Sequence, residues 1–576
     1  MNKTAIKNFA VWARNKLIAD VRYKAGLLGI SEKEIKPPLP QSSADAQFFD
    51  IGSREPYRIS GTEIARRKRL ADTITDRAKR GGYAAAYAAT VEEAAYTWFN
   101  RLIAVRFMEA NGYLPSSVRV LSGEGGKAEP DIVTAPFETD LDFTPAEREY
   151  ILACKADNHL DELFHMLFIK QCNALNAILP ELFEKTADYA GLLLNISFTD
   201  SDGVLWHLIH DVPEEDFREA VEIIGWMYQY YNTEPKQEVF DGLKKNVKIA
   251  KENIPAATQL FTPDWIVRYM VENALGRLWL EGHPNAALKA EWNYYLDEAE
   301  QTPEVSAKLG QIRKECKNLS PEDIKVIDPC MGSGHILVYA FDVLMQIYRS
   351  AGYADRDAAK LILEKNLYGL DIDRRAYQLA CFALMMKARQ YNRRILNQPA
   401  GGGSEKHHPA AFGGALPQEG NIRPLVYHPA GWGDGEEFGS LLRVDNLGER
   451  PVPTERQQIL PFDGDYETAL RVWNFKRLLS QKYDVVVTNP PYMGASGMGG
   501  KLSEFIKREY PGSKSDASTA FMEQTLYLCK PTGFMAMINI PVWMFLSSYE
   551  KLRRNILTQN TIINMLHFGR GIFGSD

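Results

Sequence analysis

The chain has 576 residues, 45% hydrophobic and 24% charged, which is the balance of a globular protein and predicts two to four domains. No stretch approaches the roughly 18 consecutive apolar residues of a membrane span, and no signal peptide is recognised, so we expect no membrane association. Six cysteines without a CxxC pair disfavour zinc or disulfides and fit a reducing cytoplasm. The net charge of −7 neither supports nor excludes nucleic acid, because only the surface that faces phosphates must be positive.

Residues 1–250 are predicted to form a mainly α-helical N-terminal domain. The segment Glu92–Gly112 places apolar residues at helical spacing and ends on a glycine. A second helix is predicted from Glu214 to Tyr231, because acidic residues favour a helix start. Within it, Trp226 and Tyr230 lie one turn apart and are expected to stack. Such aromatic stripes are more typical of helical core than of a ligand site.

From residue 251 the pattern changes to alternating strands and helices. Four short apolar runs predict strands of a parallel, doubly wound sheet, at 324–327, 367–372, 483–488 and 534–540. Residues 398–480 contain clustered glycines and are predicted to be a loop-rich insertion. His407 and His408 lie in it, and a solvated loop is favoured over a metal site because no third ligand has useful spacing. The insertion would divide the α/β domain into 251–397 and 481–576.

A glycine-rich turn, Asp328-Pro329-Cys330-Met331-Gly332-Ser333-Gly334, follows the first of these strands. Glycines there let a ligand approach the backbone, and the following helix N-terminus favours negative charge. The next strand ends in Asp371-Ile372-Asp373, where a carboxylate can accept hydrogen bonds from ribose hydroxyls. The long spacing from Gly334 to Asp371 disfavours a dehydrogenase. A turn without a ligand and an aspartate that caps the next helix are the alternatives.

The third motif is Asn489-Pro490-Pro491-Tyr492, directly after a predicted buried strand. Two prolines fix the backbone and remove two N–H donors, so the exposed groups are acceptors, namely the Asn489 side-chain oxygen and the Pro490 carbonyl. An exocyclic amine needs two acceptors for its two hydrogens, and Tyr492 offers a face for a base, worth about 1–3 kcal/mol. A base in a duplex must first be flipped out. The motif predicts methyl transfer to an amino group, without a metal.

These motifs together resemble the amino-methyltransferases of DNA in their gamma arrangement, in which a threonine-proline element, a glycine loop and a catalytic tetrapeptide follow one another. The resemblance implies a Rossmann-like class I methyltransferase fold and S-adenosyl-L-methionine as cofactor. It assigns cofactor binding to Thr262, Pro263, Asp328, Pro329, Cys330, Gly332, Gly334, Asp371 and Asp373, and catalysis to Asn489, Pro490, Pro491 and Tyr492. Phe521 matches an aromatic residue that lines the cofactor or target pocket.

Segments 96–102, 223–229 and 254–261 narrow the resemblance to the PglX family, the adenine-specific methyltransferases of BREX phage-defence systems. This implies methylation of adenine N6 at a non-palindromic host site that marks self DNA. The implied partners are double-stranded DNA with a flipped adenine and other BREX proteins. Family members are longer and carry a target-recognition region after the catalytic domain, so we expect only the N-terminal and catalytic parts here.

Two basic segments are candidate phosphate contacts. The segment Met493–Asp516 is rich in glycine and lysine and predicts a loop, either a lid over DNA with contacts from Lys501, Lys507 and Lys514 or a merely solvated loop. The run 66–69 lies on a predicted N-terminal helix, although a charge run is more often a solvated face.

Other functions remain open on the sequence alone. A tetrapeptide that holds a planar amine also fits methylation of RNA or of a protein glutamine. A scaffold that binds cofactor and DNA and recruits defence partners without catalysis is a further alternative. DNA cleavage is not predicted, because the acidic residues at 130–140 lack the closing lysine of a nuclease site.

Overall fold

The computed structural model describes residues 1–183, 189–396, 422–452 and 464–569. The chain divides into two compact units, Met1–Tyr231 and Asn232–Asp576. The boundary predicted at residue 250 therefore differs from this division, since helix α10 (Thr233–Lys244) belongs to the second unit. Among the described helices, none combines the length and apolar character needed to cross a membrane. His407 and His408 lie outside the described residues.

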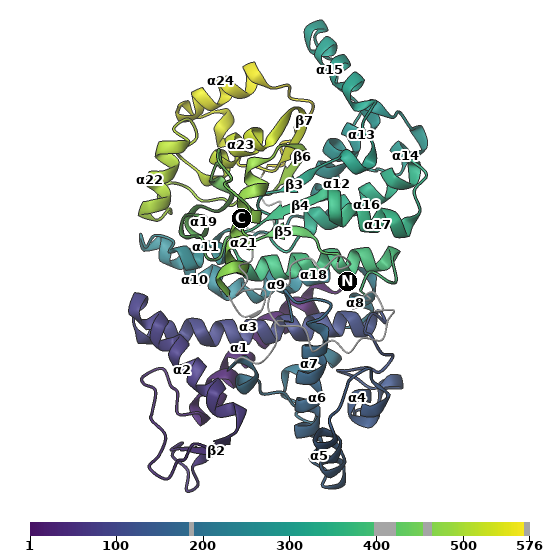
Figure 1. Ribbon diagram of the computed structural model, residues 1–576. Coiled ribbons are helices and arrows are strands. Elements are labelled where there is room, and N and C mark those ends of the chain that lie inside the picture. The colour runs from purple at the N-terminus through teal and green to yellow at the C-terminus, as the bar shows by residue number, and fades with distance from the viewer. Residues whose placement is uncertain (184–188, 397–421, 453–463, 570–576) are drawn as a thin grey trace. The chain divides into compact units, whose positions relative to one another are not determined.

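The first unit consists of helices and one small antiparallel sheet (Figure 1). Its elements are α1 (Lys3–Leu27), β1 (Ala46–Phe49), β2 (Tyr57–Ser60), α2 (Thr62–Gly81), α3 (Tyr83–Ala110), α4 (Asp131–Thr134), α5 (Pro145–Ala156), α6 (Leu160–Leu175), α7 (Val204–His210), α8 (Glu214–Glu219) and α9 (Ile223–Tyr231). Helix α3 confirms the predicted helix at Glu92–Gly112, and nearly all of its second half is buried. The unit is thus organised around an apolar central helix, as its sequence predicts.

The single helix predicted from Glu214 to Tyr231 is wrong, because the segment forms two helices, α8 and α9. Ala220 between them is extended, with φ −151° and ψ 136°. This extended residue separates a helix with an acidic first turn from an apolar one whose side chains enter the core. The predicted stacking is confirmed, since the rings of Trp226 and Tyr230 lie 5.5 Å apart at 24°.

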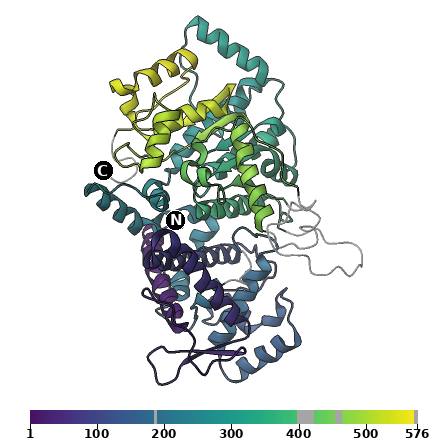
Figure 2. The same ribbon diagram turned by 60° about the vertical axis from the view of Figure 1, so that its left-hand side comes forward.

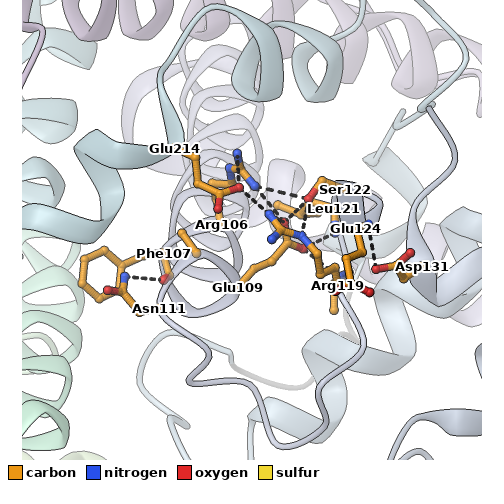
Figure 3. A network of polar contacts seen from close by, with 12 residues as sticks. Arg106, Phe107, Glu109, Asn111, Arg119, Leu121, Ser122, Glu124, Asp131 and Glu214 are labelled. Atoms are coloured by element: carbon orange, nitrogen blue, oxygen red, sulfur yellow. Dashed lines mark hydrogen bonds and ion pairs between the residues drawn. The ribbon is translucent and has the colours of Figure 1, made fainter. Parts of the chain in front are cut away.

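A buried ionic network closes the end of α3 (Figure 3). The Glu109 carboxylate accepts hydrogen bonds from the backbone N–H groups of Val120 and Leu121, both at 2.7 Å, and pairs with Arg106 at 2.8 Å. Arg119 pairs with Glu109 and with Glu214 of α8. A buried carboxylate is tolerated when it is paired and fully hydrogen-bonded, so this network holds the loop after α3 and the start of α8 in place.

The basic run at 66–69 lies on α2, and Arg67 in it is only 7% exposed. Its Nε donates to the Leu28 carbonyl at 2.8 Å, and its Nη2 donates to the Lys36 carbonyl at 2.7 Å. Its guanidinium also lies 4.0 Å from the centre of the Phe49 ring. The prediction of a phosphate contact is therefore wrong for Arg67, which anchors α2 to the preceding chain.

The second unit contains a parallel sheet of five strands in the order β5-β4-β3-β6-β7 (Figures 1 and 2). The strands are β3 (Val326–Asp328), β4 (Leu367–Leu370), β5 (Leu425–Tyr427), β6 (Tyr483–Thr488) and β7 (Cys529–Met537). The helices are α10, α11 (Ile254–Thr258), α12 (Asp264–Val271), α13 (Arg277–Gly282), α14 (Ala286–Ala290), α15 (Pro303–Cys316), α16 (His335–Ser350), α17 (Asp355–Leu361), α18 (Arg374–Tyr391), α19 (Gly433–Phe438), α21 (Gly464–Ser480), α22 (Gly500–Glu509), α23 (Ala517–Leu528) and α24 (Glu550–Gln559).

Helices cover both faces of this sheet. Leu370 of β4 packs in one apolar cluster with Phe475 of α21. The neighbouring Gly369 lies against Leu337 of α16, so closely that a Cβ there would come within 2.8 Å of it. Because successive residues of a strand point to opposite faces, α16 and α21 lie on opposite sides of the sheet. The α/β architecture predicted from the sequence is confirmed at this level.

Two segments differ from the sequence analysis. Strand β5 and helix α21 lie within the predicted insertion 398–480, so part of that segment belongs to the sheet and its cover. The short run Leu425–Tyr427, bounded by prolines at 424 and 429, was the local signal from which β5 could have been predicted. The predicted loop Met493–Asp516 is wrong where it forms α22, because Leu502, Phe505 and Ile506 are spaced for one helix face and are buried.

Candidate active site at the carboxyl edge of the sheet

The order of the strands places the three sequence motifs at one edge. The chain runs outward from β3 to β4 and β5, and then returns to place β6 beside β3. Ligands of open parallel sheets bind outside the carboxyl ends of the strands at such a reversal. The glycine turn follows β3, Asp371 follows β4 and the tetrapeptide begins directly after β6. The structure thus brings together residues that are far apart in the sequence.

Asp328 lies at the centre of this edge and is 1% exposed. Its Oδ1 accepts hydrogen bonds from the Thr488 hydroxyl at 2.7 Å and from the Cys330 backbone N–H at 3.0 Å. Its Oδ2 is buried without a hydrogen-bond partner among the described residues. Burial raises the pKa of Asp328 to about 7, opposed by these two hydrogen bonds. An orphaned carboxylate oxygen at a strand end is a place for a donor or a cation.

Asp371 is the second carboxylate of the edge and touches the glycine turn. Its Oδ2 accepts from the Gly332 N–H at 2.9 Å, and its Oδ1 accepts from the Asp373 N–H at 2.8 Å. Burial raises its pKa to about 7, and the charge of Asp373 adds to this. A carboxylate has about four acceptor positions, so Asp371 retains capacity for further donors. Asp373 caps α18 by accepting from the Arg375 N–H at 2.9 Å, and a cofactor role for it stays a prediction.

The tetrapeptide is anchored by the threonine-proline element. The Asn489 Nδ2 donates to the Thr262 hydroxyl at 3.0 Å and to the Leu260 carbonyl at 3.2 Å. On the opposite side, the Tyr492 hydroxyl donates to the Asn489 Oδ1 at 2.6 Å and also lies 3.0 Å from the Ile538 carbonyl, just after β7. Thr262 is 4% exposed. The threonine-proline element and the tetrapeptide therefore meet at a single side chain, Asn489.

Helix α10 holds the threonine-proline segment. Lys236 of α10 donates to the Gln259 carbonyl at 2.9 Å, and Asn232 donates to the Gln259 side chain at 2.8 Å. Pro263 forms the N-terminal cap position of α12, with φ −53°, which is the angle that the proline ring favours. Thr262 is thus held between a helix that precedes it and a helix that follows it.

The remaining predicted residues have different surroundings. Phe521 of α23 is 4% exposed and packs in an apolar cluster with Met493, against which Cys330 also packs. Lys501, Lys507 and Lys514 are exposed, and the first two lie on α22. The DNA contacts of these lysines stay predictions. The lysines would make them from α22 and the turn after it, and not from a loop as the sequence suggested.

Sequence reasoning missed residues that line the same edge. The Ser440 hydroxyl donates to the Pro329 carbonyl and thereby supports the glycine turn. Asn539, which follows β7, exchanges hydrogen bonds with Ser518. Ser518 in turn donates to Asp516, the N-terminal cap residue of α23. Ser440 belongs to the segment predicted as an insertion, where no local pattern marked it.

Two family models match parts of the chain that contain these residues. Residues 305–400 match the model of the N-6 DNA Methylase family, and residues 365–573 match that of the Eco57I restriction-modification methylase family. The first range contains the glycine turn and Asp371, and the second contains the tetrapeptide.

Three individual proteins are similar over most or all of the chain. An adenine-specific methyltransferase PglX of Lacticaseibacillus casei (strain Zhang) is 41% identical over all of this chain and 49% of its own length. An adenine-specific methyltransferase BrxX of Escherichia coli O9:H4 (strain HS) is 38% identical with the same coverage. A cryo-EM structure of a DrdV–DNA complex matches 96% of this chain and 37% of its own, at 10% identity and a TM-score of 0.40.

The chain spans about half the length of the two methyltransferases that it matches. The similarity covers both units of the fold, including the helical unit Met1–Tyr231, as well as every residue of the carboxyl edge. By sequence, this chain is therefore similar to the adenine-specific methyltransferases PglX and BrxX, and its residues 305–400 match the model of the N-6 DNA Methylase family.

Proposed function

We propose that this chain carries the catalytic part of an adenine-specific DNA methyltransferase that uses S-adenosyl-L-methionine to methylate adenine N6. The observation that carries the proposal is the meeting of Thr262 and Asn489 at the edge where Asp328 and Asp371 lie. The similarity to PglX and BrxX supports adenine as the base. The parallel order β5-β4-β3-β6-β7 supports a Rossmann-like class I arrangement.

The carboxyl edge fits the cofactor by the chemistry of its donor and acceptor groups. Asp371 retains acceptor capacity for the two ribose hydroxyls, beside a glycine turn whose Gly332 has open space where a Cβ would be. The unpartnered Oδ2 of Asp328 suits a positively charged group nearby. When bound, S-adenosyl-L-methionine supplies an electrophilic methyl group on a sulfonium. The residues of the chain bind and orient, and proximity provides much of the rate.

The tetrapeptide is suited to hold the target amine. The Asn489 Oδ1 and the Pro490 carbonyl are two acceptors for the two N6 hydrogens, an arrangement that directs the nitrogen lone pair toward the methyl group. The Tyr492 ring offers a face for the flipped adenine, and its hydroxyl anchors the ring to the end of β7. Holding the amine between fixed acceptors costs little reorganisation during the reaction.

The two glycines of the turn give a paired test of the cofactor site. Gly334 has φ +85°, and a Cβ would lie 3.1 Å from that of Ala380, so Gly334→Ala is expected to cost about 1–3 kcal/mol of stability. Gly332 has φ +55° and open space around it. Gly332→Ala is expected to cost about 1 kcal/mol but to weaken S-adenosyl-L-methionine binding at least about tenfold. Urea unfolding and calorimetric titration measure the two effects, and unchanged affinity in Gly332→Ala would contradict the assigned cofactor position.

A methyl-transfer assay tests the proposed function directly. The full chain is incubated with S-adenosyl-L-methionine labelled in the methyl group and with genomic DNA that lacks N6-methyladenine. We expect label in N6-methyladenine after hydrolysis of the DNA. Label in total RNA or in a protein glutamine would favour the corresponding alternative. Binding of cofactor and DNA without transfer to any of them would favour a non-catalytic scaffold.

We further propose that the chain acts in a BREX-type phage-defence system, where it marks self DNA together with other BREX proteins in a cytoplasmic setting. The similarity to PglX and BrxX supports this assignment. Exposed cations of the second unit, Lys501, Lys507 and Lys514, are proposed to contact DNA phosphates.

A further inference from the structure

The side-chain amide of Asn489 has a single favourable orientation, and the Leu260 carbonyl decides it. This carbonyl lies 3.2 Å from the Asn489 Nδ2, and a carbonyl can only accept a hydrogen bond. If the amide were rotated by 180°, two oxygens would face each other, and the partly buried Leu260 carbonyl would lose its donor. The nitrogen must therefore face Leu260, and the Oδ1 must face Tyr492.

The Thr262 hydroxyl accepts a hydrogen bond from the second N–H group of the Asn489 amide. Its distance from the Asn489 Nδ2 is 3.0 Å, and the residue is 4% exposed, so water does not easily replace the hydroxyl. A primary amide has two N–H groups, and Leu260 and Thr262 together engage both. Hydrogen bonds in a chain polarise one another, so donation by the nitrogen makes the Oδ1 a stronger acceptor. Thr262 thus affects the atom that would hold the target amine.

In this structure the Tyr492 hydroxyl already donates to the Asn489 Oδ1. It has one hydrogen and two acceptors in reach, the Asn489 Oδ1 at 2.6 Å and the Ile538 carbonyl at 3.0 Å. Burial raises its pKa above the ordinary value, so it keeps its hydrogen and acts as a donor. The hydroxyl can turn from the Oδ1 to the Ile538 carbonyl without losing a hydrogen bond. An incoming amine can therefore take the Oδ1 at little cost.

We propose that Thr262 is a positioning residue for methyl transfer, whose hydroxyl holds the Asn489 amide with its Oδ1 turned toward the target amine. The Tyr492 hydroxyl fills this position before the base arrives and turns to the Ile538 carbonyl when it does. The inference rests on the proposed function, since it needs Asn489 to hold N6. It gives the Thr262 hydroxyl a role in holding the catalytic side chain and leaves any contact with the cofactor to the other atoms of the residue.

The kinetic test compares Thr262→Val, which keeps the shape and removes the hydroxyl, with Thr262→Ser, which keeps the hydroxyl. The matched control is Thr525→Val, because Thr525 is also fully buried and donates to the Phe521 carbonyl at 2.8 Å, away from Asn489. We expect kcat on unmethylated genomic DNA to fall about tenfold or more in Thr262→Val, with cofactor affinity unchanged within about twofold. Thr262→Ser should restore kcat to within about threefold, and Thr525→Val should leave it unchanged.

A structural measurement tests the inference even if the proposed function fails. Crystal structures of the wild type and Thr262→Ser should show the Asn489 side chain in the same position, and Thr262→Val should show it displaced. An Asn489 in Thr262→Val that superimposes on the wild type, or a kcat within twofold of it, would overturn the inference. A parallel loss of cofactor affinity would also overturn it. Absence of transfer by the wild type would instead count against the proposed function alone.

Discussion

Replacing Asn489 by Ala is expected to lower the rate of methyl transfer at least about a hundredfold while leaving cofactor affinity within about threefold of the wild type. The change removes the Oδ1 that would accept from N6 and also frees Thr262 and Tyr492 from their common partner. The carboxylates of the proposed cofactor site, Asp328 and Asp371, keep their own hydrogen bonds. Single-turnover transfer to unmethylated DNA and calorimetric titration with S-adenosyl-L-methionine measure the two quantities.

Two further variants sharpen this result. Asn489→Asp keeps an acceptor oxygen at the Oδ1 position and leaves the Pro490 carbonyl in place. It would, however, place a second carboxylate oxygen against the Leu260 carbonyl, where the amide now donates. It is therefore expected to be nearly as impaired as Asn489→Ala. Asn446→Ala, an exposed asparagine in a turn, serves as the control and should retain full activity. If Asn489→Ala methylated DNA at the wild-type rate, the assignment of Asn489 as the catalytic residue would fail.

The unliganded protein is expected to lose stability as pH rises from about 4 to about 7, because of Asp328 and Asp371. Burial raises both pKa values to about 7, well above those of the unfolded chain. Between pH 4 and 7 the folded state therefore holds protons that the unfolded state has released, so the free energy of unfolding falls as pH rises. The two groups repel each other, and both contribute to this loss.

Asp328→Asn isolates this contribution. The variant removes a buried charge whose Oδ2 has no partner among the described residues. We expect it to be more stable than the wild type at pH 8 and similar at pH 5, as measured by urea unfolding at each pH. At pH 8 it should bind S-adenosyl-L-methionine at least about tenfold more weakly, because the ionised carboxylate faces a cationic ligand. Equal pH dependence in the two proteins would exclude Asp328 as the titrating group.

Local patterns were sufficient where a segment carries its own signal. The apolar runs before Asp328, Asp371 and Asn489 predicted three buried strands, and the structure shows them as β3, β4 and β6. The glycines at 332 and 334 indicated a turn after the first strand, and the structure has a turn there with both glycines at positive φ. Local signals were weak at α22, where glycines and lysines suggested a loop and the apolar spacing of Leu502, Phe505 and Ile506 was overlooked.

Tertiary contacts decided what no local pattern could. Arg67 and Ser440 were misjudged or missed because their partners, Leu28 and Pro329, are far away in the sequence. The break between α8 and α9 lies at the extended Ala220, and burial of the apolar α9 in the core overrides a continuous helical pattern.

The sequence by itself determined the chemical groups of the site and their order, because residue types and strand-end positions can be read locally. Only the tertiary structure decided how they act on one another. The parallel sheet places β6 beside β3, so that Thr488 binds Asp328. The packing of α10 and α12 brings Thr262 to Asn489 and fixes the direction of its amide. Hydrogen bonds between residues more than 150 positions apart depend on chain topology, and spacing along the sequence does not encode them.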